Sequence, residues 1–156
     1  MKKISIALTS LVLFLSSTVA FSQQDQRVKQ FNISKSSLAI DGYDPVGYFL
    51  YGKAIEGKKD ISYAYQGVTY YFNTVENRKL FMAAPSKYEP QYGGWCAYAM
   101  GASGEKVTVD PKTFKIIDSK LYLFYNSFFN NTLKSWNKNE SVLKTNADAS
   151  WTKFYH

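Results

Sequence analysis

Cys96 is the only thiol of the chain and lies in the string Pro90-Gln-Tyr-Gly-Gly-Trp-Cys-Ala-Tyr-Ala99. A nucleophilic cysteine needs a lowered pKa and usually a neighbouring base. The only histidine, His156, is the last residue, and chain ends are commonly frayed. The sequence therefore predicts no catalytic residue. Two interpretations of Cys96 stay open. It is either a thiol that binds a ligand or a metal ion, or a buried thiol that packs as a small apolar residue.

A second candidate is Asp44, which precedes Pro45 and is flanked by Tyr43 and Tyr48. A carboxylate beside phenol groups can hold a cation or accept hydrogen bonds from a ligand. An aspartate before proline also commonly caps its own turn. Asp44 is therefore either part of a binding site or a turn residue.

The third candidate is the loop Gln91-Tyr92-Gly93-Gly94. Adjacent glycines permit positive φ and a close approach of the backbone to a ligand, and they also let a bulky Trp95 enter a core. The loop lacks the lysine and spacing of a phosphate-binding loop, so nucleotide binding is not expected.

The Asp-Pro turn and the glycine turn are the two most constrained loops of the chain. We therefore hypothesise that Asp44, Tyr48, Tyr92 and Cys96 border one ligand-binding pocket. The sequence identifies neither a metal-binding set nor a cofactor.

The elements that position these loops indicate an α+β fold, a small single domain with two β-hairpins and several short helices. One hairpin pairs 61–65 with 68–72 across Gln66-Gly67, and the other pairs 114–118 with 121–125 across Ser119-Lys120. A short helix or strand is expected at 46–50, and helices at 74–84, 85–90, 95–100, 127–136 and 141–151. We expect the core-facing helix residues to be Leu80, Phe81, Ala84, Trp136, Val142, Leu143, Ala147 and Trp151. No internal repeat is apparent.

The chain begins with features of an export signal. Lys2 and Lys3 precede a mostly apolar stretch over 4–19, and Ala20-Phe21-Ser22 is a small-x-small cleavage site. We expect a signal peptide over 1–22, cleaved near Ser22, and a periplasmic or secreted protein. A flexible lead-in over 23–37 would precede the domain at 38–154. No later segment is long and apolar enough to span a membrane.

The formal net charge of the chain is +7. A basic exported protein can lie near anionic polymers or lipid headgroups, or it can simply carry a solvated lysine-rich surface. Nucleic acid is not expected as a partner, because no run of basic residues is interleaved with aromatic residues.

Several strings together resemble an exported YHS domain-containing protein of the bacterial type, with a signal peptide and one short domain. They are Gly42-Tyr-Asp-Pro-Val-Gly-Tyr-Phe49, Tyr70-Tyr-Phe-Asn-Thr-Val-Glu-Asn-Arg-Lys-Leu-Phe81, Pro85-Ser-Lys-Tyr88, the string that contains Cys96, Asp110-Pro111 and Lys120-Leu-Tyr-Leu-Phe-Tyr-Asn126. The resemblance runs from about Leu38 to Trp151.

This resemblance implies a small α+β fold near the treble-clef-like YHS and TRASH domains, which include metal-binding relatives. The cysteine positions of those relatives correspond here to Gly47, Asn73 and Asn77, none of which carries a thiol. Thiolate is the ligand that makes such a site tight for zinc or copper. The fold is therefore expected to be kept and the usual metal site to be lost.

The function that these observations favour is a non-enzymatic, exported YHS-like binding module for a metal ion or a small ligand. Two alternatives stay open. One is an envelope partner-binding or structural protein whose aromatic patch docks another chain, and the other is an enzyme with an unrecognised site around Cys96. The sequence does not indicate an oligomeric state.

Overall fold

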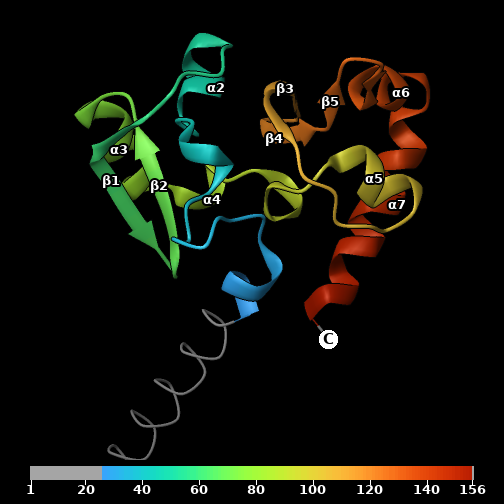
Figure 1. The fold of residues 1–156 in the computed structure, drawn as a ribbon, viewed down its shortest axis with the longest axis horizontal. Helices are drawn as coiled ribbons and strands as arrows, with labels where there is room; N and C mark the ends of the chain where they lie inside the picture. Colours follow the sequence, from blue (N-terminus) through green and yellow to red (C-terminus); the bar gives the residue numbers. More distant parts are fainter. Residues whose placement is uncertain (1–25, 156) are drawn as a thin grey trace, which may run out of the picture.

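The computed structural model describes residues 26–155 and confirms a mixed α+β fold (Figure 1). The predicted signal peptide and its cleavage site lie outside the described residues. The elements in chain order are η1 (Ile40–Gly42), α2 (Gly47–Tyr51), β1 (Lys58–Tyr65), β2 (Val68–Phe72), α3 (Val75–Ala83), α4 (Pro85–Tyr88), η2 (Gln91–Gly94), α5 (Ala97–Ala102), β3 (Asp110–Ile117), β4 (Lys120–Phe124), β5 (Asn126–Ser127), β6 (Asn130–Asn131), α6 (Thr132–Lys138), α7 (Glu140–Thr152) and η3 (Lys153–Tyr155).

Both predicted hairpins are confirmed as antiparallel pairs, β1 with β2 and β3 with β4. Gln66 and Gly67 have φ of 47° and 82°, as a two-residue turn with two positive φ angles requires. In the second hairpin the two positive φ angles belong to Asp118 and Ser119. That turn therefore begins one residue earlier than predicted.

The helix predictions hold where a cap and a proline mark the ends. Thr74 caps α3, since its Oγ1 accepts a hydrogen bond from the Asn77 N–H at 3.0 Å, and the helix ends before Pro85. Phe81 is buried as predicted, but Leu80 is 41% exposed, which corrects the expected core face.

The prediction of a helix over 127–136 is wrong in its first half. Residues 126–131 form the small β5–β6 hairpin, and α6 begins only at Thr132, where Asn131 caps it. Trp136 and Ala147 are buried as expected, whereas Val142 of α7 is 51% exposed.

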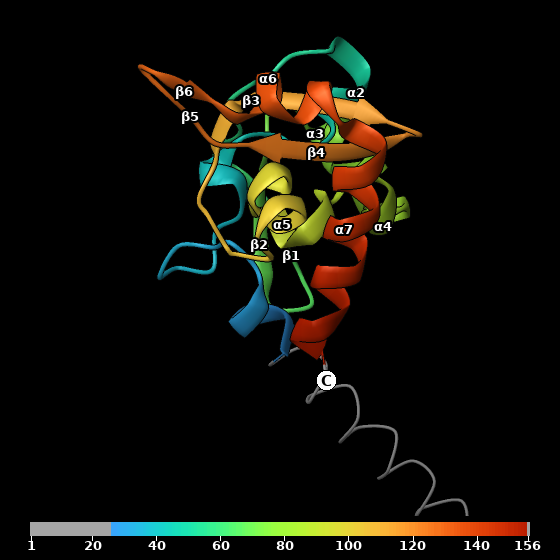
Figure 2. The same cartoon turned by 90° about the vertical axis from the view of Figure 1, so that its right-hand side faces the viewer.

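Strand β4 separates two clusters of buried residues. Leu121 and Leu123 belong to the first cluster, and Tyr122 and Phe124 belong to the second. Side chains of a strand alternate between its two faces, so one face of β4 serves each cluster. In Figure 2 the β3–β4 hairpin lies crosswise to β1 and β2.

The described part of the predicted lead-in packs against the domain. Residues 26–30 form a helical turn, and Phe31 is 9% exposed in the first cluster. The Arg27 guanidinium lies 2.5 Å from Glu89 Oε1, and the Asn32 N–H donates to the Gly93 carbonyl at 2.9 Å. Phe31 and a partly buried ion pair therefore hold this segment against the domain.

The backbone also contains an internal repeat. The sequence analysis found no repeat, and the structure corrects that prediction. Residues 38–73, here called the first unit, match residues 90–125, the second unit, at a constant separation of 52 positions. Within these units the positive φ angles occur in matching pairs. The pairs are Ile40 (53°) with Tyr92 (54°), Asp41 (49°) with Gly93 (59°), Gly42 (83°) with Gly94 (85°), Gly52 (60°) with Gly104 (74°), Gln66 (47°) with Asp118 (49°), and Gly67 (82°) with Ser119 (58°).

Pairing between segments repeats with the same separation. Leu38 bridges Thr69 in parallel, and Pro90 bridges Leu121 in parallel. Both hairpins join a strand of 8 residues to one of 5, with the register shift at the same place, between Lys58 and Ser62 in one and Asp110 and Phe114 in the other. Only Gly42, Gly52, Tyr70 and Phe72 of the first unit are kept as the same residue in the second.

The units differ in how they continue. In the first, α3 begins at Val75, and the equivalent start in the second would be residue 127. Helix α6 instead begins at Thr132, after the β5–β6 hairpin. This hairpin is therefore an insertion into the second copy of the repeat.

The close packing of α5 on α7 yields a stability prediction. A Cβ on Gly101 would lie 2.3 Å from the Leu143 carbonyl oxygen, a backbone atom that has little freedom to move. We expect Gly101→Ala to lower the free energy of unfolding by about 3 kcal/mol, because the helices must separate. Urea denaturation followed by circular dichroism measures this change.

Gly52→Ala is the matched control, since a Cβ there meets nothing within 4 Å and only the φ of 60° opposes it. Its cost should be about 1 kcal/mol. Equal losses for the two variants would contradict the close helix contact.

Candidate functional site

Asp44 is fully buried and its carboxylate is a hydrogen-bond node. Oδ1 accepts from the N–H groups of Val46 at 2.9 Å and Gly47 at 3.3 Å. Oδ2 accepts from the Asn73 N–H at 2.8 Å and from the Asn77 side-chain amide at 2.6 Å. Four donors from three segments satisfy one carboxylate, so a buried charge is compensated without a ligand.

The positions that the resemblance assigns to lost metal ligands converge on this node. Gly47 is far in sequence from Asn73 and Asn77, and all three donate hydrogen bonds to Asp44. Gly47 has no side chain, and the amides of Asn73 and Asn77 are engaged as donors, to the Glu56 carbonyl and to Asp44. This donor set does not fit zinc or copper, which prefer thiolate and imidazole ligands.

Tyr48 joins the two units. Its hydroxyl donates to the Pro111 carbonyl at 2.9 Å, and its ring packs edge-on against Phe114 at a centroid distance of 4.7 Å. Burial raises the pKa of this phenol far above its ordinary value. Tyr48 therefore keeps its proton and acts as a packing residue.

Tyr92 lies beside an open cleft of about 410 Å³. Its hydroxyl donates to Asp148 Oδ1 at 2.8 Å, and burial, then this hydrogen bond, raises the pKa of the phenol. The cleft is lined by Arg27, Phe31, Ser86, Glu89, Pro90, Gln91, Tyr92, Gly93, Asp148, Trp151 and Thr152. Tyr92 is the one predicted site residue in this lining.

The glycine turn is constrained by packing. A Cβ on Gly93 would lie 2.9 Å from Phe31 Cδ2 and 2.9 Å from Trp151 Cη2. The positive φ of 59° adds a second reason for glycine. The features that suggested a ligand loop are therefore explained by the rings packed against it.

Cys96 is fully buried, and the backbone N–H of Tyr125 donates to its Sγ at 3.3 Å. Thr132 Oγ1 lies 3.4 Å from Sγ and donates its own proton to the Tyr125 carbonyl. The thiol proton is therefore directed at Thr132 Oγ1. These contacts are those of a packed thiol, which holds Tyr125 at the end of the second unit.

The structure does not bring the four predicted site residues to one pocket. Tyr48 belongs to the first core cluster and Tyr92 to the second, and the two clusters use opposite faces of β4. Asp44, Tyr48 and Cys96 do not line the cleft beside Tyr92. The two constrained loops are far from a common pocket because each copy of the repeat contains one of them. The Asp-Pro turn belongs to the first unit and the glycine turn to the second.

Within residues 26–155, no group of three or more His, Cys, Asp or Glu residues could hold a metal ion. Among the helices of the same residues, none combines the length and the apolar character needed to cross a bilayer.

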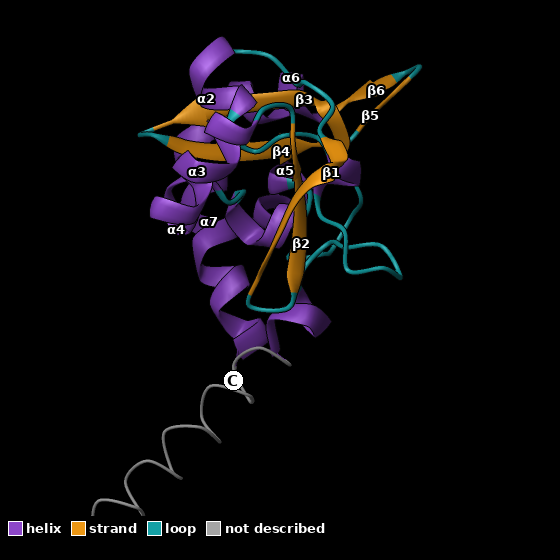
Figure 3. Cartoon of the chain, turned by 90° about the vertical axis from the view of Figure 1, so that its left-hand side faces the viewer, coloured by secondary structure: helices purple, strands orange, loops and turns teal. Residues whose placement is uncertain are grey.

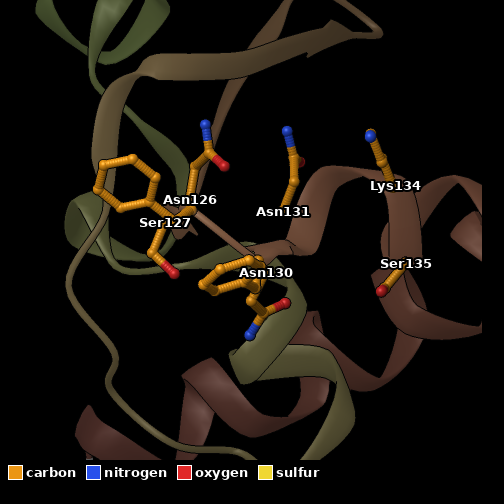
Figure 4. Close-up of a pocket in the computed structure, with 8 residues that line it drawn as sticks. Asn126, Ser127, Asn130, Asn131, Lys134 and Ser135 are labelled. Carbon is orange, nitrogen blue, oxygen red and sulfur yellow. The ribbon is translucent and has the colours of Figure 1, made fainter.

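The feature that the sequence analysis missed is the tip of the β5–β6 hairpin. Phe128 and Phe129 are 102% and 103% exposed, against 51% or less for the other large hydrophobic residues exposed in the described chain. An adjacent hollow of about 360 Å³ is lined by this hairpin and by Lys134 and Ser135 of α6 (Figure 4). Adjacent phenylalanines between Ser127 and Asn130 are the available signal, although the sequence predicts a helix over them.

Comparison with protein-family models, with curated proteins and with solved structures gave no match.

The Asp44 node yields a second prediction. Asp44→Asn keeps the side-chain volume but replaces one acceptor oxygen by an N–H₂ group that opposes the existing donors. We expect a loss of about 3 kcal/mol in the free energy of unfolding, measured by urea denaturation. Asp60→Asn, at an exposed position on β1, should change it by less than about 0.5 kcal/mol. Equal effects would show that the node contributes little.

Thiol labelling tests the state of Cys96. In the folded protein we expect Cys96 to react with an aromatic disulfide reagent on the order of 10³-fold more slowly than in urea, because the thiol reacts only after opening. A Val142→Cys substitution in a Cys96→Ser background provides a half-exposed control thiol that should react rapidly. A native Cys96 that reacts at the control rate would overturn the packed assignment.

Proposed function

We propose that the protein is an exported, non-enzymatic binding module of the YHS type that engages its partner through the β5–β6 hairpin. The observation that carries this proposal is the complete exposure of two adjacent phenylalanine side chains at the tip of the hairpin. The strings that resemble YHS proteins support the family assignment, as does the convergence of Gly47, Asn73 and Asn77 on one buried carboxylate.

The chemistry of the interior favours binding over catalysis. The phenols of Tyr48 and Tyr92 have raised pKa values because they are buried, so neither supplies a base near neutral pH. The Cys96 thiol is buried beside a threonine hydroxyl and a backbone amide, and no histidine lies within residues 26–155 to activate it.

Exposed aromatic residues at a projecting tip favour a docking role. Single exposed hydrophobic residues are ordinary on protein surfaces, but adjoining apolar groups at one projecting point mark interaction sites. A turn between two short strands needs no aromatic residue for its own formation. The rings of Phe128 and Phe129 are not packed against the domain, since both side chains are as exposed as in an extended chain. They therefore do not stabilise its fold.

The position of the hairpin in the repeat supports the same proposal. Strand order, turns and register are common to the two units, and the β5–β6 segment is the part of the second copy that the first lacks. A segment added to a complete structural unit, with its apolar side chains turned outward, is explained by contact with another molecule.

Site-specific crosslinking in the producing cells tests this proposal. A photoreactive benzoyl-phenylalanine at position 129 should yield covalent adducts after irradiation, because the ring is in contact with the partner. The same residue at position 142, which is exposed on α7, is the control and should yield few adducts. Intact-mass analysis of the purified protein detects adducts with lipid as well as with protein. Equal adduct yields at the two positions would exclude docking through the hairpin.

A further inference from the structure

Starting from the proposed docking role of the hairpin, we infer that its partner is the surface of an anionic lipid bilayer. In this arrangement Phe128 and Phe129 enter the interface between headgroups and acyl chains, and lysines beside the hairpin face lipid phosphates. The inference combines the exposure of the two rings, the charge of the surrounding segment and the projection of the hairpin from the domain.

The segment around the hairpin contains cations and no anions. Between Asp118 and Glu140 the sequence has no aspartate or glutamate, and two lysines, Lys134 and Lys138, follow the hairpin. A third lysine, Lys120, lies beside the β3–β4 turn, at the opposite end of β4 from the hairpin. Lys134 borders the hollow beside the tip, and Lys138 lies in the last turn of α6. In the folded chain one carboxylate lies at the base of the hairpin, where Asp110 Oδ2 is 3.4 Å from Asn126 Nδ2. Toward the tip the hollow is lined by Lys134 and by no carboxylate, so lipid phosphates would meet attraction there.

The polar residues that surround the two rings are amides and hydroxyls. Asn126, Ser127, Asn130 and Asn131 make up the two strands, and Ser135 of α6 completes the border with Lys134. Neutral donors and acceptors suit the hydrated headgroup region, where phosphate and ester oxygens accept hydrogen bonds. Aromatic side chains next to such groups and to lysines are typical of segments that lie in the membrane interface.

The hairpin is placed so that a flat surface can reach its tip. In Figures 2 and 3 the β5–β6 ribbon extends away from the body of the domain, beyond the ends of β3 and β4. A narrow projection with both rings at its end can enter an interface without carrying the rest of the domain into it. A groove of another protein would instead be expected to contact the flanks of the hairpin, where side chains are small and uncharged.

Vesicle binding tests the inference. The protein as recovered from producing cells, with its N-terminus determined by mass spectrometry, is sedimented with vesicles of phosphatidylcholine containing about one third phosphatidylglycerol. We expect binding at least about tenfold stronger than that of the double variant Phe128→Ser with Phe129→Ser. Removing the phosphatidylglycerol, or raising the salt from about 0.1 M to about 0.5 M, should weaken binding by a similar factor.

Two controls separate the hairpin from general stickiness. The double variant Leu50→Ser with Met82→Ser removes half-exposed apolar side chains elsewhere and should bind like the wild type. Lys134→Gln should weaken binding several-fold, and Lys79→Gln on α3 should not, since α3 follows the first unit and does not line the hollow beside the tip. All these sites are exposed, so the melting temperature should stay close to that of the wild type.

A Phe129→Trp variant reports the depth of the tip directly. Its tryptophan emission should shift to shorter wavelength on the anionic vesicles, because the indole leaves water. Wild-type protein that stays in the supernatant, or a double serine variant that binds equally well, would overturn the inference. Protein adducts at position 129 in cells without vesicle binding would overturn the bilayer as partner and leave hairpin docking intact. Failure of both experiments would reject the proposed function as well.

Discussion

The burial of β4 on both faces is the constraint on which the rest of the structure depends. A strand with one sheet partner would normally offer one face to solvent, but four of its five residues are buried. Because its side chains alternate, Leu121 and Leu123 close one core while Tyr122 and Phe124 close the other. Any shift of one residue in the register of β3 with β4 would exchange these side chains and disrupt both cores together.

The two units reach the same backbone arrangement with different chemistry. The backbone N–H that follows the second strand donates to the Asp44 carboxylate in the first unit and to the Cys96 thiol in the second. Asp44 and Cys96 also each donate their own N–H to an equivalent carbonyl, of Ile55 at 2.8 Å and of Val107 at 2.9 Å. The Asp44 carboxylate, a strong hydrogen-bond acceptor, and the Cys96 thiol, a weak one, therefore occupy equivalent positions. The repeat fixes where a side chain accepts this hydrogen bond but not which residue type accepts it. The lone cysteine thus has a structural counterpart in the first unit.

The sequence predicted the elements whose ends have a local cause. The Gln66-Gly67 turn, the Thr74 cap and Pro85 each fix a boundary through backbone geometry that a short string reveals. The helix predicted at 127–136 failed because its apolar spacing suits a helix, although Asn130 and Asn131 favour a turn and a cap. The repeat was hidden because matching φ angles are carried by different residues, such as Ile40 and Tyr92. The exposed tip escaped the sequence analysis for a related reason, since it carries no motif, whereas the constrained loops drew attention to residues that are packed in the two cores.

The contact of Phe31 with Trp151 links segments at opposite ends of the described chain. Their ring centroids are 6.2 Å apart, and both side chains pack against the glycine turn that begins the second unit. The ring of Phe31 therefore lacks part of its packing surface until Trp151 is in place. The order of assembly follows from this dependence. Phe31 is synthesised long before Trp151 and packs only after it, and long-range closure of this kind slows folding. The site of Phe31 therefore stays open until α7 has been synthesised and packed.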